Sequence, residues 1–196
     1  ELAKTISLKK STKTSSIKPL NIINESRDTT HYSIIDSEGN AVSNTYTLGA
    51  SFGSGVTIPG TGILMNNQMN NLTYRSGDVE KEGRRVSLGN RFKPGKRPMS
   101  TMAPVMIFNE NNELTLITGS PGGSYIPGVI LRVVTGVIDF NLNIGEATML
   151  PRVHKDWPYK GIDYEKTLSS DIVKSLNKIG HKTSSNKTMG STQSIH

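Results

Sequence analysis

The chain has 196 residues, 34% hydrophobic and 20% charged, with a net charge of +7, which suits one soluble domain and favours polyanionic partners. Its longest apolar run, 127–140, is interrupted by Arg132 and Gly136 and is shorter than the roughly 20 residues that span a membrane, and no apolar signal-peptide region follows Glu1. The absence of cysteine excludes disulfides, thiolate nucleophiles and thiolate metal sites, so covalent catalysis would require an oxygen or nitrogen nucleophile.

The first 28 residues are rich in serine, threonine and lysine and show no sustained hydrophobic period, which predicts a linker or an exposed tail. The composition changes at Thr29. The β-prone runs 30–35 and 41–48 flank turn-forming residues at 36–40, so we predict a β-hairpin here.

A third strand is predicted at Gly62–Asn66, and a long basic loop between Leu72 and Pro98 follows it. This loop has four glycines, little apolar periodicity and only three acidic residues, which predicts a solvent-exposed segment. Its eight basic residues are Arg75, Lys81, Arg84, Arg85, Arg91, Lys93, Lys96 and Arg97.

Residues 104–108 and 114–118 are β-prone and flank a turn rich in asparagine and glutamate, which predicts a second hairpin. The mostly apolar run 126–140 has the length and spacing of a buried helix. Hairpins followed by helices indicate an α+β fold.

A further helix is predicted at 172–179, with its start signal at Ser169 and its stop at Gly180. Residues 191–195 are again β-prone and continue to the last residues of the sequence. This pattern suggests that the sequence stops inside an element.

Thr29 stands where the linker-like segment ends and the first strand begins. A threonine hydroxyl is a poor nucleophile unless a base lies beside it, and a freed α-amino group of the same residue can be that base. Cleavage between Asp28 and Thr29 would supply this amine. In an isolated Asp-Thr-Thr sequence, however, the threonine is more often a strand start or a cap.

Six motifs, taken together, resemble the γ-glutamyltranspeptidase family in order and spacing, and the match extends from Thr29 to the end of the sequence. They are TTHYS at 29–33, TYT at 45–47, GILMNNQM at 62–69, RPMSTM at 97–102, TGSPGGS at 118–124 and MGSTQS at 189–194. The resemblance implies the four-layer αββα sandwich of N-terminal-nucleophile hydrolases. It also implies a precursor that cuts itself before Thr29, so that 1–28 ends a large subunit and 29–196 forms the catalytic small subunit.

By resemblance, Thr29 forms the γ-glutamyl ester and its amine moves the proton, while Thr47 hydrogen-bonds and orients this nucleophile. Gly122 and Gly123 match the oxyanion-hole pair of the family. A glycine pair ahead of a helix can direct backbone N–H groups toward a developing negative oxygen, although such a pair alone is usually a plain turn.

Donor recognition by resemblance involves Gln68, Ser100 and Thr101. Ser100 matches the position that binds the donor α-carboxylate, and Thr101 replaces the usual second serine. Two substitutions depart from the family pattern: Gly49 stands for an asparagine and Asn71 for an aspartate that help hold the free α-ammonium group. Their loss favours a donor whose α-nitrogen is an uncharged amide, as inside poly-γ-glutamate.

The basic loop occupies the place of the family lid, and Arg84 and Arg85 would attract a polymer with one carboxylate per residue. The chain therefore resembles the poly-γ-glutamate capsule depolymerase branch. This branch implies transfer of the polymer to an amine acceptor such as a peptidoglycan peptide, and an extracellular or cell-surface location.

Two alternatives remain at this point: an ordinary glutathione γ-glutamyltranspeptidase, and a basic non-catalytic module that binds an acidic polymer. We expect no nucleic-acid partner, because the aromatic residues are not interleaved with lysine or arginine. The four histidines have no metal-ligand spacing, so we expect neither metal nor cofactor.

Overall fold

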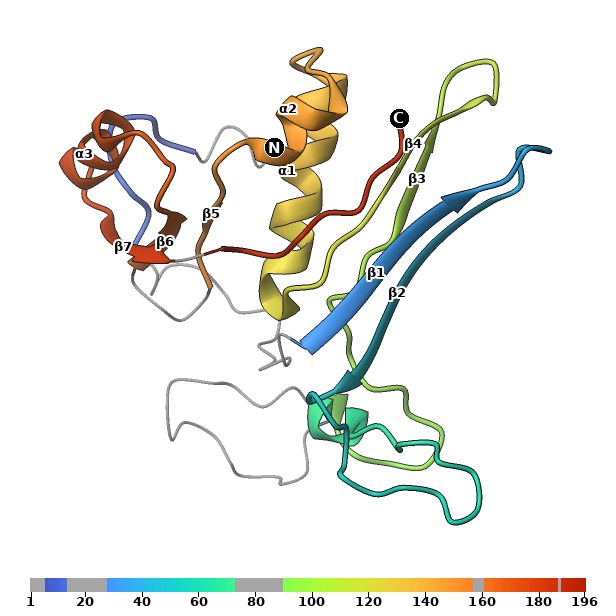
Figure 1. Ribbon diagram of the computed structural model, residues 1–196. Coiled ribbons are helices and arrows are strands. Elements are labelled where there is room, and N and C mark those ends of the chain that lie inside the picture. Colours follow the sequence, from blue (N-terminus) through green and yellow to red (C-terminus); the bar gives the residue numbers. More distant parts are fainter. Residues whose placement is uncertain (1–5, 14–27, 73–89, 157–160, 187) are drawn as a thin grey trace.

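The computed structural model describes residues 6–13, 28–72, 90–156, 161–186 and 188–196. These ranges form two antiparallel hairpins, two central helices and a three-stranded sheet with one helix beside it (Figure 1). Helices and strands are therefore mixed, as the α+β prediction requires. None of the helices in the described ranges combines the length and the apolar character that crossing a membrane requires.

The first hairpin consists of β1 (Asp28–Ile35) and β2 (Ala41–Gly49), and it confirms the prediction for this region. Its turn is closed by the Asp36 carboxylate, which accepts hydrogen bonds from the backbone N–H groups of Glu38 and Asn40 and from the Asn40 amide. The side-chain hydrogen bond from Asn40 is the main reason that the pKa of Asp36 lies below its usual value.

The predicted third strand at Gly62–Asn66 is wrong. Its residues form a loop that is joined to 50–58 by one antiparallel bridge, between Thr57 and Leu64. The loop turns at Gly60 and Gly62, both with positive φ. Backbone hydrogen bonds from Ile58 to Ile63 and from Met65 to Val56 join its arms, but no regular ladder forms. The segment ends in the 3-10 turn η3 (Gln68–Asn71).

The second hairpin, β3 (Val105–Phe108) and β4 (Leu114–Thr118), is also as predicted. The C-terminal stretch is not a strand of its own. It runs beside β4 through one antiparallel bridge, Ile117 to Ile195, and through a hydrogen bond from the Gln193 N–H to the Gly119 carbonyl. The end of the sequence therefore extends this sheet edge.

The predicted helix at 126–140 is confirmed as α1 (Ile126–Ile138), preceded by the 3-10 turn η5 (Gly123–Tyr125). Its buried residues recur every three or four positions, and each large one contributes about 1.5 to 3 kcal/mol by burial. They are Ile126, Val129, Ile130, Val133, Gly136 and Val137.

Four elements are additional to the predictions. The first is α2 (Ile144–Met149), whose Ala147 packs with Val133 and Val137 of α1. The others are the strands of the third sheet: β5 (Val153–His154), β6 (Gly161–Glu165) and β7 (Lys182–Asn186).

The predicted second helix is confirmed as α3 (Ser170–Lys178), with Ser169 as its N-cap. The chain leaves this helix through Gly180, which has φ +98° and so takes a conformation that glycine adopts without strain. The helix connects the parallel strands β6 and β7.

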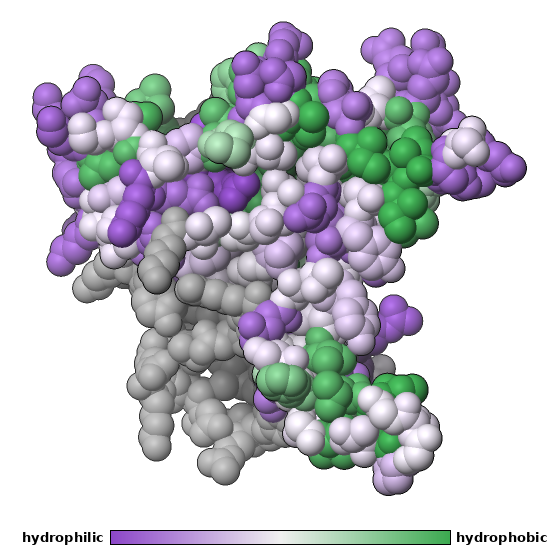
Figure 2. Space-filling view, in the orientation of Figure 1, coloured by the Kyte–Doolittle hydropathy of each residue, from purple (hydrophilic) through white to green (hydrophobic). Residues whose placement is uncertain are grey.

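The first hairpin has a buried polar face and an exposed apolar face. His31 and Thr45 point inward and are buried, whereas the opposite face carries large hydrophobic side chains between 44% and 57% exposed. In Figure 2, hydrophobic residues gather on the surface in the region of the hairpins. The exposed set on this face is Tyr32, Ile34, Val42 and Tyr46, and Ile35 at the end of β1 is also exposed but lies on the side of His31.

Candidate functional site

Thr29 lies at an irregular step in the first hairpin. Asp28 pairs with Gly49 and Thr30 with Tyr46, so the register of the ladder shifts at Thr29. Such irregularities re-aim side chains and are frequent beside active sites. The Thr29 hydroxyl oxygen is buried and has no hydrogen-bond partner among the residues that the structure describes.

A pocket of about 280 Å³ surrounds this threonine. It is lined by the start of β1, the end of β2 and the residues just after β2: Asp28, Thr29, Thr30, Tyr46, Thr47, Leu48, Ala50 and Ser51. Sequence prediction placed Thr29 and Thr47 in one site, and the structure brings both to this pocket.

Thr47 contacts the peptide bond that precedes Thr29. Its hydroxyl donates to the Asp28 carbonyl oxygen at 2.7 Å and accepts the Gly49 N–H at 2.9 Å. Asp28 and Thr29 belong to one continuous strand, so this is the geometry of the uncut chain. The hydrogen bond withdraws electron density from the Asp28 carbonyl carbon, which the Thr29 hydroxyl would have to attack in a self-cleavage reaction.

The predicted oxyanion turn lies at the N-terminal end of α1, with φ +139° at Gly122 and +58° at Gly123. The Thr101 hydroxyl donates to the Gly123 carbonyl at 2.8 Å, which ties the RPMSTM segment to this turn. At Gly119, a side-chain carbon would collide with the His31 ring. The RPMSTM and TGSPGGS motifs therefore meet each other, and TGSPGGS also meets His31 of TTHYS.

The proposed donor residues at 68–71 form a separate hydrogen-bonded unit. The Asn71 amide donates to Gln68 Oε1 at 3.0 Å and to the Met99 carbonyl at 3.2 Å, while Asn90 donates to the Asn71 carbonyl at 2.6 Å. Asn71 is buried, and Gln68 Nε2 is buried without a hydrogen-bond partner among the described residues. Ser100, one residue beyond Met99, is exposed.

Gly49 has φ +93°, and a side-chain carbon there would collide with the carboxamide of Asn67. Asn67 Oδ1 accepts the Ala50 N–H at 3.0 Å, so the amide of Asn67 fills the space beside Gly49. Sequence reasoning missed this residue, because the contact crosses 17 positions and has no local pattern.

His31 was expected to be structural or at the surface. It is a buried residue of β1 that contacts Thr45 of β2 and packs against Gly119. Its Nδ1 lies 2.8 Å from the Thr45 hydroxyl and its Nε2 3.1 Å from Ser33 Oγ, which donates to the Gln193 carbonyl. Because Ser33 uses its proton on Gln193, His31 Nε2 carries the hydrogen and Nδ1 accepts from Thr45. Burial lowers the pKa of His31.

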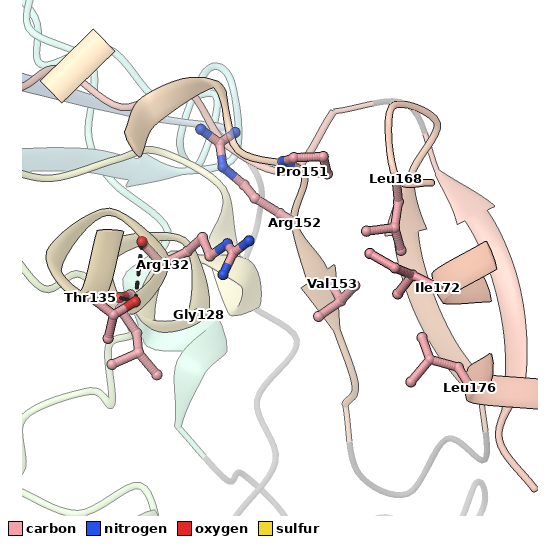
Figure 3. Close-up of a pocket in the computed structure, with 10 residues that line it drawn as sticks. Gly128, Arg132, Thr135, Pro151, Arg152, Val153, Leu168, Ile172 and Leu176 are labelled. Atoms are coloured by element: carbon pink, nitrogen blue, oxygen red, sulfur yellow. Dashed lines mark hydrogen bonds between the residues drawn. The ribbon is translucent and has the colours of Figure 1, made fainter. Parts of the chain in front are cut away.

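Arg84 and Arg85 lie outside the described residues. Within the described ranges no group of three or more metal-ligating side chains occurs. A second pocket, of about 470 Å³, lies between α1 and α3 (Figure 3). It is mostly aliphatic, with Leu168, Ile172 and Leu176 facing Gly128 and Arg132, and it contains none of the predicted site residues.

Comparison with known proteins assigns the family. The family model for gamma-glutamyltranspeptidase matches residues 1–196. The chain therefore belongs to the gamma-glutamyltranspeptidase family, which confirms the resemblance seen in the six motifs.

A curated relative, the glutathione hydrolase proenzyme of Escherichia coli (strain K12), is 40% identical over 195 residues, or 99% of this chain and 33% of the relative. A solved mutant of the Helicobacter pylori gamma-glutamyltranspeptidase matches with a TM-score of 0.77 and 39% identity, over 85% of this chain and 90% of that chain. The Bacillus anthracis transpeptidase CapD matches with a TM-score of 0.62 and 26% identity, over 84% of each chain. This chain thus spans about a third of its curated relative's length.

Proposed function

We propose that the chain provides the catalytic part of a γ-glutamyl acyl-transfer enzyme, with Thr29 as its nucleophile after self-cleavage at Asp28–Thr29. The observation that carries the proposal is the arrangement at this bond. The Thr29 hydroxyl is buried and has no hydrogen-bond partner in the described residues. The carbonyl oxygen of Asp28, just before it in the chain, accepts a hydrogen bond from the Thr47 hydroxyl at 2.7 Å.

In self-cleavage, Thr29 Oγ1 attacks the Asp28 carbonyl carbon, the C–N bond breaks, and the acyl group moves from nitrogen to oxygen. Water then hydrolyses this ester, which leaves an Asp28 carboxylate and a free amine on Thr29. In turnover, the hydroxyl attacks the donor γ-carbonyl while the amine takes its proton, and the Gly122–Gly123 turn supplies N–H groups for the oxyanion. The donor amine leaves with this proton, and water or an amine acceptor releases the γ-glutamyl group.

The test uses the full precursor, including its upstream region. Thr29→Ala is expected to abolish both self-cleavage and turnover, while Thr29→Ser retains part of each because the hydroxyl remains. Thr167→Ala, in an exposed turn away from the pocket, serves as control. Intact mass and N-terminal sequencing follow the cleavage, and release of the donor amine follows turnover. Full activity in Thr29→Ala would contradict the proposal that Thr29 is the nucleophile.

The donor class proposed here is poly-γ-glutamate, whose internal residues carry an uncharged α-amide. Support comes from Asn71 and from Gly49, where the Asn67 carboxamide leaves no space for a side chain. Both Asn71 amide hydrogens point to oxygens, at Gln68 and Met99, so an aspartate in the same pose would place a carboxylate oxygen against the Met99 carbonyl. The local structure therefore suits a neutral side chain.

Glutathione is the second candidate donor, and the names of the relatives favour it: the Escherichia coli relative is a glutathione hydrolase. Rates on the two donors decide between them. A higher kcat/KM for the polymer supports the first donor class, and a preference for glutathione supports the second. Asn71→Asp is expected to shift the preference toward donors with a free α-ammonium group.

The basic loop is proposed to bind the polymer through Arg84 and Arg85. Replacing both with glutamine should raise KM for poly-γ-glutamate more than for glutathione, with an effect that shrinks as salt increases. Lys178→Gln with Lys182→Gln removes the same charge from an exposed surface and is the control. Equal changes for both donors would exclude this role.

The remaining parts of the proposal concern assembly. A large subunit from the same precursor completes the four-layer αββα sandwich, and 1–28 is its last segment. The acceptor is water or an amine of the cell wall such as a peptidoglycan peptide, and the location is extracellular or at the cell surface. Support comes from the curated relative, a proenzyme of which this chain spans 33%.

A further inference from the structure

The Gly122–Gly123 turn rests directly on the C-terminal segment. A side-chain carbon at Gly122 would lie 3.3 Å from the Gly190 Cα, and one at Gly190 would lie 2.7 Å from the Pro121 carbonyl oxygen. Residues 120–122 and 189–191 therefore touch through their backbones, with no room for a methyl group between them. A shift of Gly190 would move the turn.

Ser120 adds a polar link across this contact. Its hydroxyl accepts the Ser191 N–H at 3.0 Å and donates to the Pro121 carbonyl at 2.6 Å, and the residue is fully buried. The backbone of the turn is thus tied to Ser191 on one side of Gly190.

On the other side of Gly190, a buried ion pair holds Met189. Glu165 Oε1 accepts the Met189 N–H at 2.7 Å, and Arg152 Nη1 donates to the Met189 carbonyl at 2.9 Å. Both polar backbone atoms of this residue are therefore bound by charged groups. The Arg152 and Glu165 side chains are only 9% and 10% exposed and lie 3.4 Å apart.

The ion pair is itself anchored to rigid elements. Arg152 Nη2 donates to the Thr148 carbonyl in α2 at 2.9 Å, and the Arg152 N–H donates to Glu165 Oε2 at 3.0 Å. The Arg152 side chain points away from Val153 and the residues of α3 (Figure 3). The pair thus connects α2 and β6 to the C-terminal segment.

We propose that Arg152 and Glu165 are positioning residues for the oxyanion turn and act on it through Met189 and Gly190. This inference rests on the proposed function. A buried ion pair adds little net stability over apolar residues of the same size, because desolvation offsets its attraction. What it supplies here is a fixed position for Met189, and oxyanion stabilisation depends on N–H groups held at the right place before the reaction.

The first test compares two glycines with the same φ of +76° in the full precursor. Gly190→Ala places a methyl group against Ser120 and Pro121, whereas Gly60→Ala meets nothing within 4 Å. We expect kcat to fall about tenfold or more in Gly190→Ala, since loss of one oxyanion donor costs roughly 100- to 1,000-fold, with little change in KM. Gly60→Ala carries the same backbone strain and should retain kcat.

The second test is Glu165→Gln, which keeps the shape of the side chain. Each carboxylate oxygen of Glu165 accepts a backbone N–H, and glutamine replaces one of these two acceptors with an NH₂ donor. Its kcat should fall with KM nearly unchanged, while Asp171→Asn, in the exposed pair with Lys174, should leave both constants unchanged. Ser120→Ala, which only removes a hydroxyl, is the milder variant if the others do not fold.

Rates are divided by the fraction of chains cut before Thr29, and folding is checked by thermal unfolding. Folded, cut variants with wild-type kcat would overturn the positioning role. A loss expressed only in thermal stability would also overturn it. Absence of turnover in the wild-type precursor would instead contradict the proposed function.

Discussion

At the scale of single residues, Gly49 and Asn67 form a pair that limits which side chains the site accepts. Gly49→Ala adds a carbon that collides with the Asn67 carboxamide at φ +93°, and we expect a loss of about 1 to 3 kcal/mol in the free energy of unfolding. Gly39→Ala, at φ +84° with open space around it, is the control and should cost only the backbone strain. Urea denaturation measures both. Equal losses would show that Asn67 moves aside without cost.

His31 gives a prediction for pH. Burial lowers its pKa in the folded chain, so below the usual histidine pKa of about 6.5 the unfolded state binds more protons than the folded state. Stability should therefore be complete above this pH and decrease as the pH falls below it toward the lowered value. Urea midpoints between pH 8 and 5 measure the effect. His31→Gln should flatten the plot of urea midpoint against pH in this window, and replacing the exposed His196 with glutamine should not.

At the scale of elements, α2 depends on its cap. Asn143 accepts the Glu146 N–H at 2.9 Å, and Glu146 accepts the Asn143 N–H at 3.2 Å, which closes a capping box. Asn143→Ala should cost about 0.5 to 2 kcal/mol of stability. Lys174→Ala, which removes an exposed ion pair, should cost less than about 0.5 kcal/mol. A similar loss in both variants would mean that the box contributes nothing.

The cap matters beyond its own helix because α2 covers the C-terminal half of α1. A side-chain carbon at Gly136 would lie 3.0 Å from Ala147 Cβ, so the two helices touch closely. The same α2 provides the Thr148 carbonyl that anchors Arg152. Fraying of α2 would therefore loosen both the core and the segment behind the Gly122–Gly123 turn.

At the scale of the whole molecule, the exposed apolar face of the first hairpin is the main liability. Ile34 and Val42 lie opposite each other and are 52% and 45% exposed. Replacing both with threonine should increase the soluble fraction of the chain made alone, because β-prone apolar surface promotes association. Ile6→Thr with Leu8→Thr also replaces two aliphatic residues with threonine, at 69% and 89% exposure outside the hairpin, and is the control.

The same variant also tests the proposed assembly. If the large subunit covers this face, the threonine variant should lower the yield of two-subunit protein when the full precursor is made, and the control pair should not. Yield is measured by size-exclusion chromatography after self-cleavage. An unchanged yield would place the large subunit elsewhere.

Local sequence predicted the elements that have a clear β-prone run beside a turn or a helical apolar spacing. The β-prone runs at 30–35 and 41–48 and the apolar spacing of 126–140 each became the expected element. The strand at 62–66 failed because its pairing with 54–58 stops at one bridge and does not extend into a ladder. The polar strand β7, with the sequence KTSSN, has no apolar alternation to detect, and it forms by parallel pairing with β6 across α3.

The sequence by itself determined the family, through six ordered motifs that the family match confirms, and the residue types available for chemistry. Only the tertiary structure decided which groups meet: Thr47 with the Asp28 carbonyl, Asn67 in the space beside Gly49, and the ion pair behind Gly190. The physical reason is distance along the chain. Motif and periodicity describe neighbours within a few positions, whereas these contacts join segments 17 to 37 residues apart and exist only when the surrounding elements pack.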